Sequence, residues 1–225
     1  MSKVFIIGLP RTGTTSVSVA LLEMGFKVAH QAFTKQSFEL ADVVSDAPCF
    51  SDYRQLHKLY PNAKFVYLER ALDAWVPSMQ MLLSRMLVHL DNKTGKFHPI
   101  LKRSFDHCFD VNGIDDPLDA EHLVSCYLSH KGQVFDYFKQ FNVNNFMCID
   151  ISQPNSLIQL HQFLASDLNF SGELSIDDCR SEGEGFPHLN RGRNVASWDE
   201  YKHPNKVSTN AKGPDKRKFF DYKLL

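Results

Sequence analysis

The chain has 225 residues and a formal net charge of −1 at pH 7, with 43% apolar and 23% charged residues. This composition is typical of a soluble globular protein with enough chain for one large domain. It provides no global electrostatic attraction for nucleic acid or for an anionic membrane, so we expect neither as a partner, and local basic groups must attract any bound anion.

The cysteine pattern and the shortness of the apolar stretch near the start of the sequence favour a reducing compartment. The number of cysteines, 5, is odd and no two are spaced as C-x-x-C, so neither a disulfide framework nor a zinc ribbon is predicted. The apolar stretch 4–9 is too short for a signal-peptide core or a membrane span. We therefore expect a cytoplasmic protein without a metal site.

Apolar periodicity along the chain alternates between strands and helices. Val4–Ile7 is apolar throughout, which predicts a strand buried on both faces, and the spacing from Thr15 to Met24 predicts a helix that Gly25 ends. The later expected elements are a strand at 26–29, helices at 37–44 and 53–60, a strand at 64–68, a helix running to about residue 90, a helix at 119–141, a strand at 146–149 and a helix at 154–164. This alternation predicts an α/β fold with a mostly parallel central sheet flanked by helices.

The domain organisation predicted is a single domain over 1–225. Pro77 stands near the start of the helix that runs to about residue 90, so we expect that helix to begin late or to kink there. The segment 91–117 mixes glycine, proline, histidine and charge, and is expected to form an insert or lid. From about residue 171 the chain is expected to be loop-rich.

The segment Gly8–Ser16 joins the first strand to the first helix through a turn that contains glycine. Backbone N–H groups of such a turn converge on one point, where the helix dipole favours a phosphate. Gly13 permits close approach of the backbone, and Arg11 adds a guanidinium fork. Further hydroxyl donors are Thr12, Thr14, Thr15 and Ser16. This strand–turn–helix context predicts a nucleotide-phosphate site.

The loop differs from the P-loop of nucleotide triphosphatases. The pattern G-x-x-x-x-G-K-[ST] requires lysine at the position of Thr14, whereas the cation of this chain stands earlier, at Arg11. Without that lysine, the usual contact with the β- and γ-phosphates is missing. A P-loop kinase or hydrolase is therefore the weaker alternative.

Two motifs together resemble one family. Pro10–Ser16 resembles the 5′-phosphosulfate loop, roughly P-[KR]-[ST]-G-T-[TS], of sulfotransferases that use 3′-phosphoadenosine 5′-phosphosulfate (PAPS). Arg70, at the end of a predicted strand, and Ser78 resemble the arginine and serine that hold the 3′-phosphate in that family. Such an arginine lies at the sheet edge where open α/β folds bind nucleotides. The resemblance implies a P-loop-nucleotide-hydrolase-like sulfotransferase fold, PAPS as donor, 3′-phosphoadenosine 5′-phosphate (PAP) as product, and no metal.

The resemblance covers most of the chain from Val4 to Asn190, and 91–117 matches poorly. Further matching stretches are Tyr60–Val66, Trp75 and Phe186–Asn190. Beyond them, Arg191, Gly192 and Arg193 resemble the basic R-x-G loop that closes over the 3′-phosphate.

Sulfuryl transfer also needs charge stabilisation at the transferring group and a base for the proton of the acceptor. We expect Arg11 to supply the charge and Asp46 to be the base. Asp46 stands shortly before Pro48, a position similar to that of the catalytic histidine in cytosolic sulfotransferases, and other branches use a carboxylate there. Partial burial is required to raise the pKa of Asp46 toward neutrality.

His30, at the end of the second predicted strand, is the alternative base, because the pKa of histidine suits proton transfer. Lower-ranked candidates are Asp52, His57 and His188. The expected acceptor is a hydroxyl or amine of a small molecule or carbohydrate. A module that binds PAP or PAPS without transferring sulfate, and a homodimer, stay open as alternatives.

Overall fold

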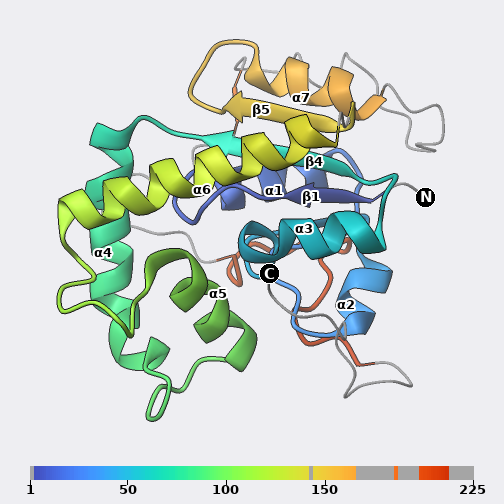
Figure 1. Ribbon diagram of the computed structural model, residues 1–225. Coiled ribbons are helices and arrows are strands. Elements are labelled where there is room, and N and C mark those ends of the chain that lie inside the picture. Colours follow the sequence, from blue (N-terminus) through green and yellow to red (C-terminus); the bar gives the residue numbers. More distant parts are fainter. Residues whose placement is uncertain (1–2, 142–143, 166–184, 187–197, 213–225) are drawn as a thin grey trace.

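The computed structural model describes residues 3–141, 144–165, 185–186 and 198–212 (Figure 1). Its central sheet has the strand order β2-β3-β1-β4-β5, and every pairing between these strands is parallel. The strands are β1 (Val4–Ile6), β2 (Val28–Ala29), β3 (Val43–Ser45), β4 (Lys64–Glu69) and β5 (Phe146–Asp150). The predicted α/β fold with a parallel sheet is confirmed.

Helices cover both faces of this sheet. They are α1 (Thr14–Glu23), α2 (Lys35–Leu40), α3 (Cys49–Leu59), α4 (Leu72–Leu90), α5 (Pro99–Phe109), α6 (Ala120–Gln140) and α7 (Ser156–Ala165). In Figure 1, α3 and α6 lie in front of the sheet and α1 lies behind it. Alternate residues of β1 serve the two faces: Phe5 packs in a cluster with α3 and α6, whereas Val4 and Ile6 pack in a cluster with α1 and α7.

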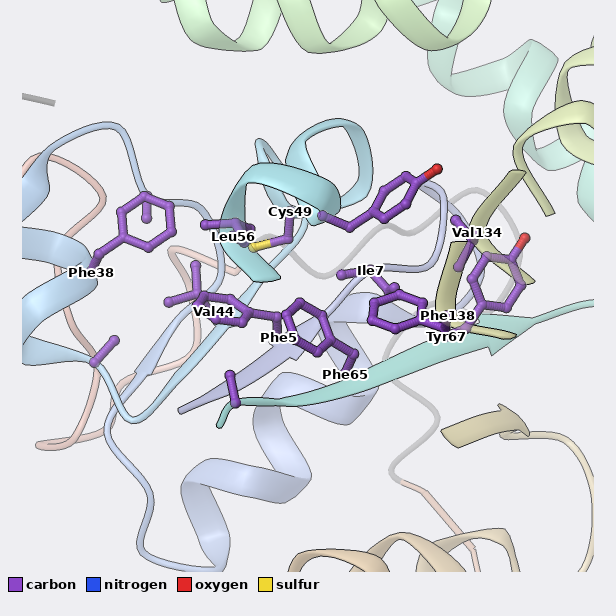
Figure 2. Close-up of a cluster of buried hydrophobic side chains, with 14 of the residues drawn as sticks. Phe5, Ile7, Phe38, Val44, Cys49, Leu56, Phe65, Tyr67, Val134 and Phe138 are labelled. Atoms are coloured by element: carbon purple, nitrogen blue, oxygen red, sulfur yellow. The ribbon is translucent and has the colours of Figure 1, made fainter. Parts of the chain in front are cut away.

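The front cluster is rich in aromatic rings. Figure 2 shows Phe5, Phe65 and Phe138 within it, and the centroid of the Phe65 ring lies 5.4 Å from that of Phe5 and 4.9 Å from that of Phe138. Contacts of this kind between buried rings stabilise the packing of the strands against the helices. The cluster therefore holds β1 and β4 in place. Arg11 lies in the loop after β1, and Arg70 directly follows β4.

The helix predicted at 37–44 is wrong in its second half. Helix α2 ends at Leu40, Ala41 is extended with φ −81° and ψ 137°, and 43–45 forms the strand β3. A short apolar run does not distinguish helix from strand by its period, and here pairing of Val43 with both Val4 and Val28 decides. This difference matters for the site, because Asp46 directly follows a strand of the sheet and not a helix.

The late start predicted for α4 is also wrong. The helix begins at Leu72 with Pro77 inside it. Proline lacks the N–H that would bond to the carbonyl of Asp73, but Trp75 and Met79 on either side are fully buried and anchor the helix by packing. Other boundaries shift as well: α3 already begins at Cys49, β2 only at Val28 and α7 only at Ser156.

The segment 91–117 is more regular than the sequence suggested. It contains α5, whose apolar residues Leu101, Phe105 and Phe109 are buried in a cluster with residues of α4 and α6. An ion pair between Arg103 and the buried carboxylate of Asp52 ties α5 to α3. In the described part of the chain, no helix is long and apolar enough to cross a membrane.

Candidate functional site

The carboxyl ends of the strands open into one pocket of about 1240 Å³. Each strand places a charged or titratable residue there, since Arg11, His30, Asp46, Arg70 and Asp150 all line it from the ends of different strands. Parallel strands bring such residues to the same edge of the sheet. A typical small-molecule site has roughly 300–1,000 Å³, so this pocket has room for a nucleotide and a second molecule.

All the described residues that the sequence predicted for the site, apart from the lower-ranked candidates Asp52 and His57, line this pocket. These residues are Arg11, Thr12, Gly13, Thr14, Thr15, Ser16, His30, Asp46, Arg70 and Ser78. The predicted loop Arg191, Gly192 and Arg193 lies outside the described residues, as does His188.

The loop after β1 leaves the start of α1 open to an anion. Gly13 is the N-cap of α1 in a left-handed conformation, with φ 105°, and no side chain caps the helix. The N–H groups at the first positions of a helix have no acceptor within it, so those of Thr14, Thr15 and Ser16 are available to a ligand. Together with the helix dipole, this geometry suits a phosphate or sulfate oxygen.

Gly13→Ala is expected to damage this loop. A Cβ at Gly13 would stand 2.2 Å from Cδ1 of Ile151, at a φ that L-residues disfavour. We expect a loss of about 1–2 kcal/mol in stability and weaker binding of PAP. Thermal denaturation and calorimetry measure both. The matched control is Gly132→Ala in α6, where a Cβ meets no atom within 4 Å, and which is expected to be neutral or stabilising. Unchanged stability and PAP affinity in the Gly13 variant would contradict this account of the loop.

Hydrogen bonds join the loop to β4 and α4. Arg11 donates from Nε to Oγ of Ser78 at 2.8 Å, and Arg70 donates from Nη1 to the carbonyl of Arg11 at 2.7 Å. Trp75 donates from Nε1 to the carbonyl of Pro10 at 2.9 Å. The two predicted motifs, separate in the sequence, therefore form one connected unit.

The two arginines of this unit have no acidic partner among the described residues. Glu69, the neighbour of Arg70, pairs instead with Lys131 of α6. Burial lowers the pKa of Arg11, and the charges of Arg70 and Arg85 lower it further. Adjacent cations that are partly buried and lack a counter-carboxylate are stabilised by a bound anion.

Arg11 and Asp46 share an unusual backbone conformation. Their φ values are 70° and 58°, in the left-handed region that residues with a side chain rarely adopt. Conformations of this kind cost on the order of 1–3 kcal/mol and cluster at functional sites, where they aim side chains. Both residues line the pocket, and they are two of the three positions that the sequence assigned to chemistry, the third being His30.

Asp46 and His30 face each other in the pocket. Oδ2 of Asp46 lies 3.5 Å from Nε2 of His30. Burial raises the pKa of Asp46 to about 6, and the backbone N–H of Ala47 and the side chain of Gln31 oppose that shift. Oδ1 of Asp46 is buried and has no hydrogen-bond partner among the described residues. A carboxylate with this pKa and a free oxygen can accept a proton at neutral pH.

A chain of hydroxyl groups orients His30. Its Nδ1 lies 2.9 Å from Oγ of Ser45, which lies 2.7 Å from Oγ of Ser18, and Ser18 donates to the carbonyl of Thr14. Its Nε2 lies 3.2 Å from Oγ1 of Thr15. Burial, with a further contribution from Lys206, lowers the pKa of His30 to about 4. The imidazole is thus neutral at pH 7 and links the loop to Asp46.

The lower-ranked candidates have structural partners. Asp52 is buried and bonds to Arg103 and to the hydroxyl of Ser51. His57 bonds through Nδ1 to the hydroxyl of Tyr137, at 3.0 Å, on the front face of the sheet. Neither residue lines the pocket.

Sequence reasoning missed the contribution of residues 198–210. Trp198, Asp199 and the stretch 206–210 all line the pocket. The ring centroid of Trp198 lies 5.1 Å from that of His30. The sequence shows only a polar and basic stretch with few aliphatic residues there, and no motif marks it.

Comparison with known proteins places the chain in a family. The model of the family described as "Sulfotransferase domain" matches two overlapping stretches, residues 3–38 and 31–194. A comparison with curated proteins finds no match. The matched stretches include both motifs and all the strands of the sheet. The chain therefore belongs to the sulfotransferase domain family.

Proposed function

We propose that the protein transfers a sulfuryl group from PAPS to a hydroxyl or amine of a small-molecule or carbohydrate acceptor. The observation that carries the proposal is the pair Arg11 and Arg70, which stand at an uncapped helix start without an acidic partner among the described residues. Two adjacent anionic groups joined by a short linker satisfy this arrangement, as in a nucleotide that has a 5′-phosphosulfate and a 3′-phosphate.

The donor set fits such a nucleotide. The first-turn N–H groups of α1 and the guanidinium of Arg11 suit the 5′-phosphosulfate. Arg70 and Ser78, at the end of β4 and on α4, suit the 3′-phosphate. The loop Arg191, Gly192 and Arg193 is proposed to add contacts to that phosphate. The donor is then held between β1 and β4, and no metal ion is required.

Asp46, which lines the pocket, is the proposed base, and its carboxylate is the proton acceptor. It takes the proton of the acceptor hydroxyl as the acceptor oxygen bonds to sulfur. The bond between sulfur and the bridging phosphate oxygen breaks in the same displacement, and Arg11 stabilises the charge that grows on that oxygen. His30 is a positioning residue that stands 3.5 Å from Oδ2 of Asp46.

The test is calorimetric titration with PAP and with ADP, which lacks the 3′-phosphate. The wild-type protein is expected to prefer PAP. Arg70→Ala removes a charge-assisted hydrogen bond, so PAP affinity should fall by about 10- to 100-fold while ADP affinity changes little. Arg54→Ala, an arginine on α3 that does not line the pocket, is the control and should alter neither affinity. Preference for ATP with Mg²⁺ would contradict the proposal, and an equal loss for both ligands would refute the role of Arg70.

A further inference from the structure

The β2 and β3 side of the pocket lies away from the proposed donor contacts. The strand order places β1 in the centre, with β4 and β5 on one side and β3 and β2 on the other. The proposed donor contacts lie at β1, β4 and α4, and the proposed base Asp46 comes directly after β3. The free part of the pocket next to Asp46 is therefore bounded by the residues after β2 and by the segment that packs on the edge of β2.

The stretch 205–211 packs on that edge of the sheet. Val28 of β2 donates its N–H to the carbonyl of Asn205 at 3.0 Å, and the N–H of Val207 donates to the carbonyl of Val28 at 2.9 Å. The N–H of Phe33 donates to the carbonyl of Thr209 at 3.0 Å. Backbone pairing at this edge extends the sheet by a short parallel segment, and this gives residues 206–210 a fixed place beside the pocket.

Side chains of α2 and of the turn before it hold the same stretch. Ser37 donates its hydroxyl to the carbonyls of Ser208 and Thr209, each at 2.8 Å, and Thr34 donates to the carbonyl of Ala211 at 2.9 Å. These bonds engage the backbone of the stretch. Thr209 and Asn210 both line the pocket, and these bonds do not use their side chains.

The wall that residues 206–210 form lies beyond the residues that the family model matches. The match ends at residue 194, whereas the wall begins at residue 206. The loop, the base and the 3′-phosphate residues all lie inside the match. The proposed donor site therefore consists of residues that the family model matches, whereas the wall beside Asp46 consists of residues outside the match.

The wall offers uncharged polar groups at Thr209 and Asn210. The carboxamide of Asn210 and the hydroxyl of Thr209 have no hydrogen-bond partner within the described residues, and both residues line the pocket. The ammonium of Lys206, by contrast, is occupied by the carbonyls of Trp198 and Tyr201. Apolar lining is also present: Phe33, stacked on His98 with ring centroids 4.4 Å apart, and Leu82 of α4.

We propose that residues 206–210 form the acceptor wall of this enzyme, and that Thr209 and Asn210 select an acceptor that has an apolar body and an uncharged hydrogen-bonding group. The proposal rests on the proposed sulfotransferase function. Thr209 and Asn210 carry no charge that could pair with an anionic acceptor, and a purely apolar acceptor leaves their polar groups without partners, which costs affinity.

Three phenols of similar size test the wall as acceptors: 4-hydroxybenzamide, 4-methylphenol and 4-hydroxybenzoate. PAP release from PAPS gives kcat/KM for each with the full chain. The variant Asn210→Ala should lower kcat/KM for the amide by about five- to tenfold, the effect of one hydrogen bond, and leave 4-methylphenol within about twofold. For each phenol, the kcat/KM of the variant is divided by that of the wild-type protein, so that differences in the intrinsic reactivity of the phenols cancel. Lys212→Ala, exposed in the same stretch but outside the pocket, is the matched control and should change none of them.

The outcomes separate the two proposals. Failure of the wild-type protein to bind PAP contradicts the sulfotransferase function itself. If PAP binds, three results overturn the acceptor wall: no transfer to any phenol, an equal effect of Asn210→Ala on all three, or no effect on the amide. A loss confined to the amide, with PAP affinity unchanged, supports it.

Discussion

Asp46→Asn is expected to lower the rate of sulfate transfer by about 10²- to 10⁴-fold, the usual contribution of a general base. The amide keeps the shape of the side chain and cannot take the acceptor proton. Affinity for PAP should be unchanged, because Asp46 comes directly after β3 and the proposed nucleotide contacts lie at β1, β4 and α4. Steady-state kinetics with any active acceptor and calorimetry with PAP measure the two quantities. Asp199→Asn, another carboxylate that lines the pocket, is the control and should retain most activity.

The pH profile distinguishes the two candidate bases. With Asp46 as the base, kcat/KM should fall as pH drops through about 6, where burial places its pKa. With His30 as the base, the fall should come near pH 4, where burial and Lys206 place the pKa of the imidazole. An inflection near 4 that disappears in His30→Gln would overturn the assignment to Asp46.

Stability gives an independent check on Asp46→Asn. The folded pKa of about 6 lies above the value of about 4 expected for an unfolded chain. The unfolded state therefore ionises first, and the carboxyl group costs the folded state stability as pH rises from about 4 to about 6, a loss that is complete above that range. Asparagine removes this cost of up to about 3 kcal/mol, so the variant should unfold at an equal or higher urea concentration at pH 7. Lower stability would show that the loss of activity is a folding defect.

Arg11→Ala is expected to lower kcat/KM by about 10²- to 10³-fold. This is the usual effect of removing a hydrogen-bond donor that stabilises the charge developing in the transition state. The guanidinium is held by Ser78, so it is oriented before the substrates bind. Alanine inherits the same backbone strain that arginine already bears at φ 70°, and thermal stability should change little. The variant Arg11→Lys keeps the positive charge but lacks the planar guanidinium fork. Its kcat/KM should lie between the values of the wild-type protein and of Arg11→Ala.

The control for Arg11 is Arg85→Ala. Arg85 is near enough to act on Arg11 through its charge, but it does not line the pocket. We expect the kcat/KM of Arg85→Ala to differ from that of the wild-type protein by less than about threefold. If Arg11→Ala raises KM for PAPS and leaves kcat unchanged, Arg11 contributes only to ground-state binding and its proposed catalytic role is wrong.

The residues of the proposed donor half could be brought together from the sequence because its parts are local. The glycine of the loop, the arginine beside it and the start of the helix lie within nine residues, Gly8–Ser16, and a strand precedes them. Arg70 and Ser78 belong to one strand–helix connection. Backbone geometry and helix polarity determine what such short segments bind, and both depend on the local sequence. The α/β class was predictable from the alternation of patterns for the same reason.

Only the tertiary structure determined the proposed acceptor wall and the environment of the proposed base, Asp46. Val43–Ser45 is a strand only because β1 and β2 pair with it, and this pairing brings Asp46 beside His30. The pKa of about 6 arises from burial by segments remote in sequence, which no local pattern records. Residues 206–210 reach the pocket by backbone hydrogen bonds to β2 that any sequence can make. The sequence by itself therefore determined where the proposed phosphate contacts lie in the chain, and long-range packing determined the burial of the proposed base and which residues stand beside it.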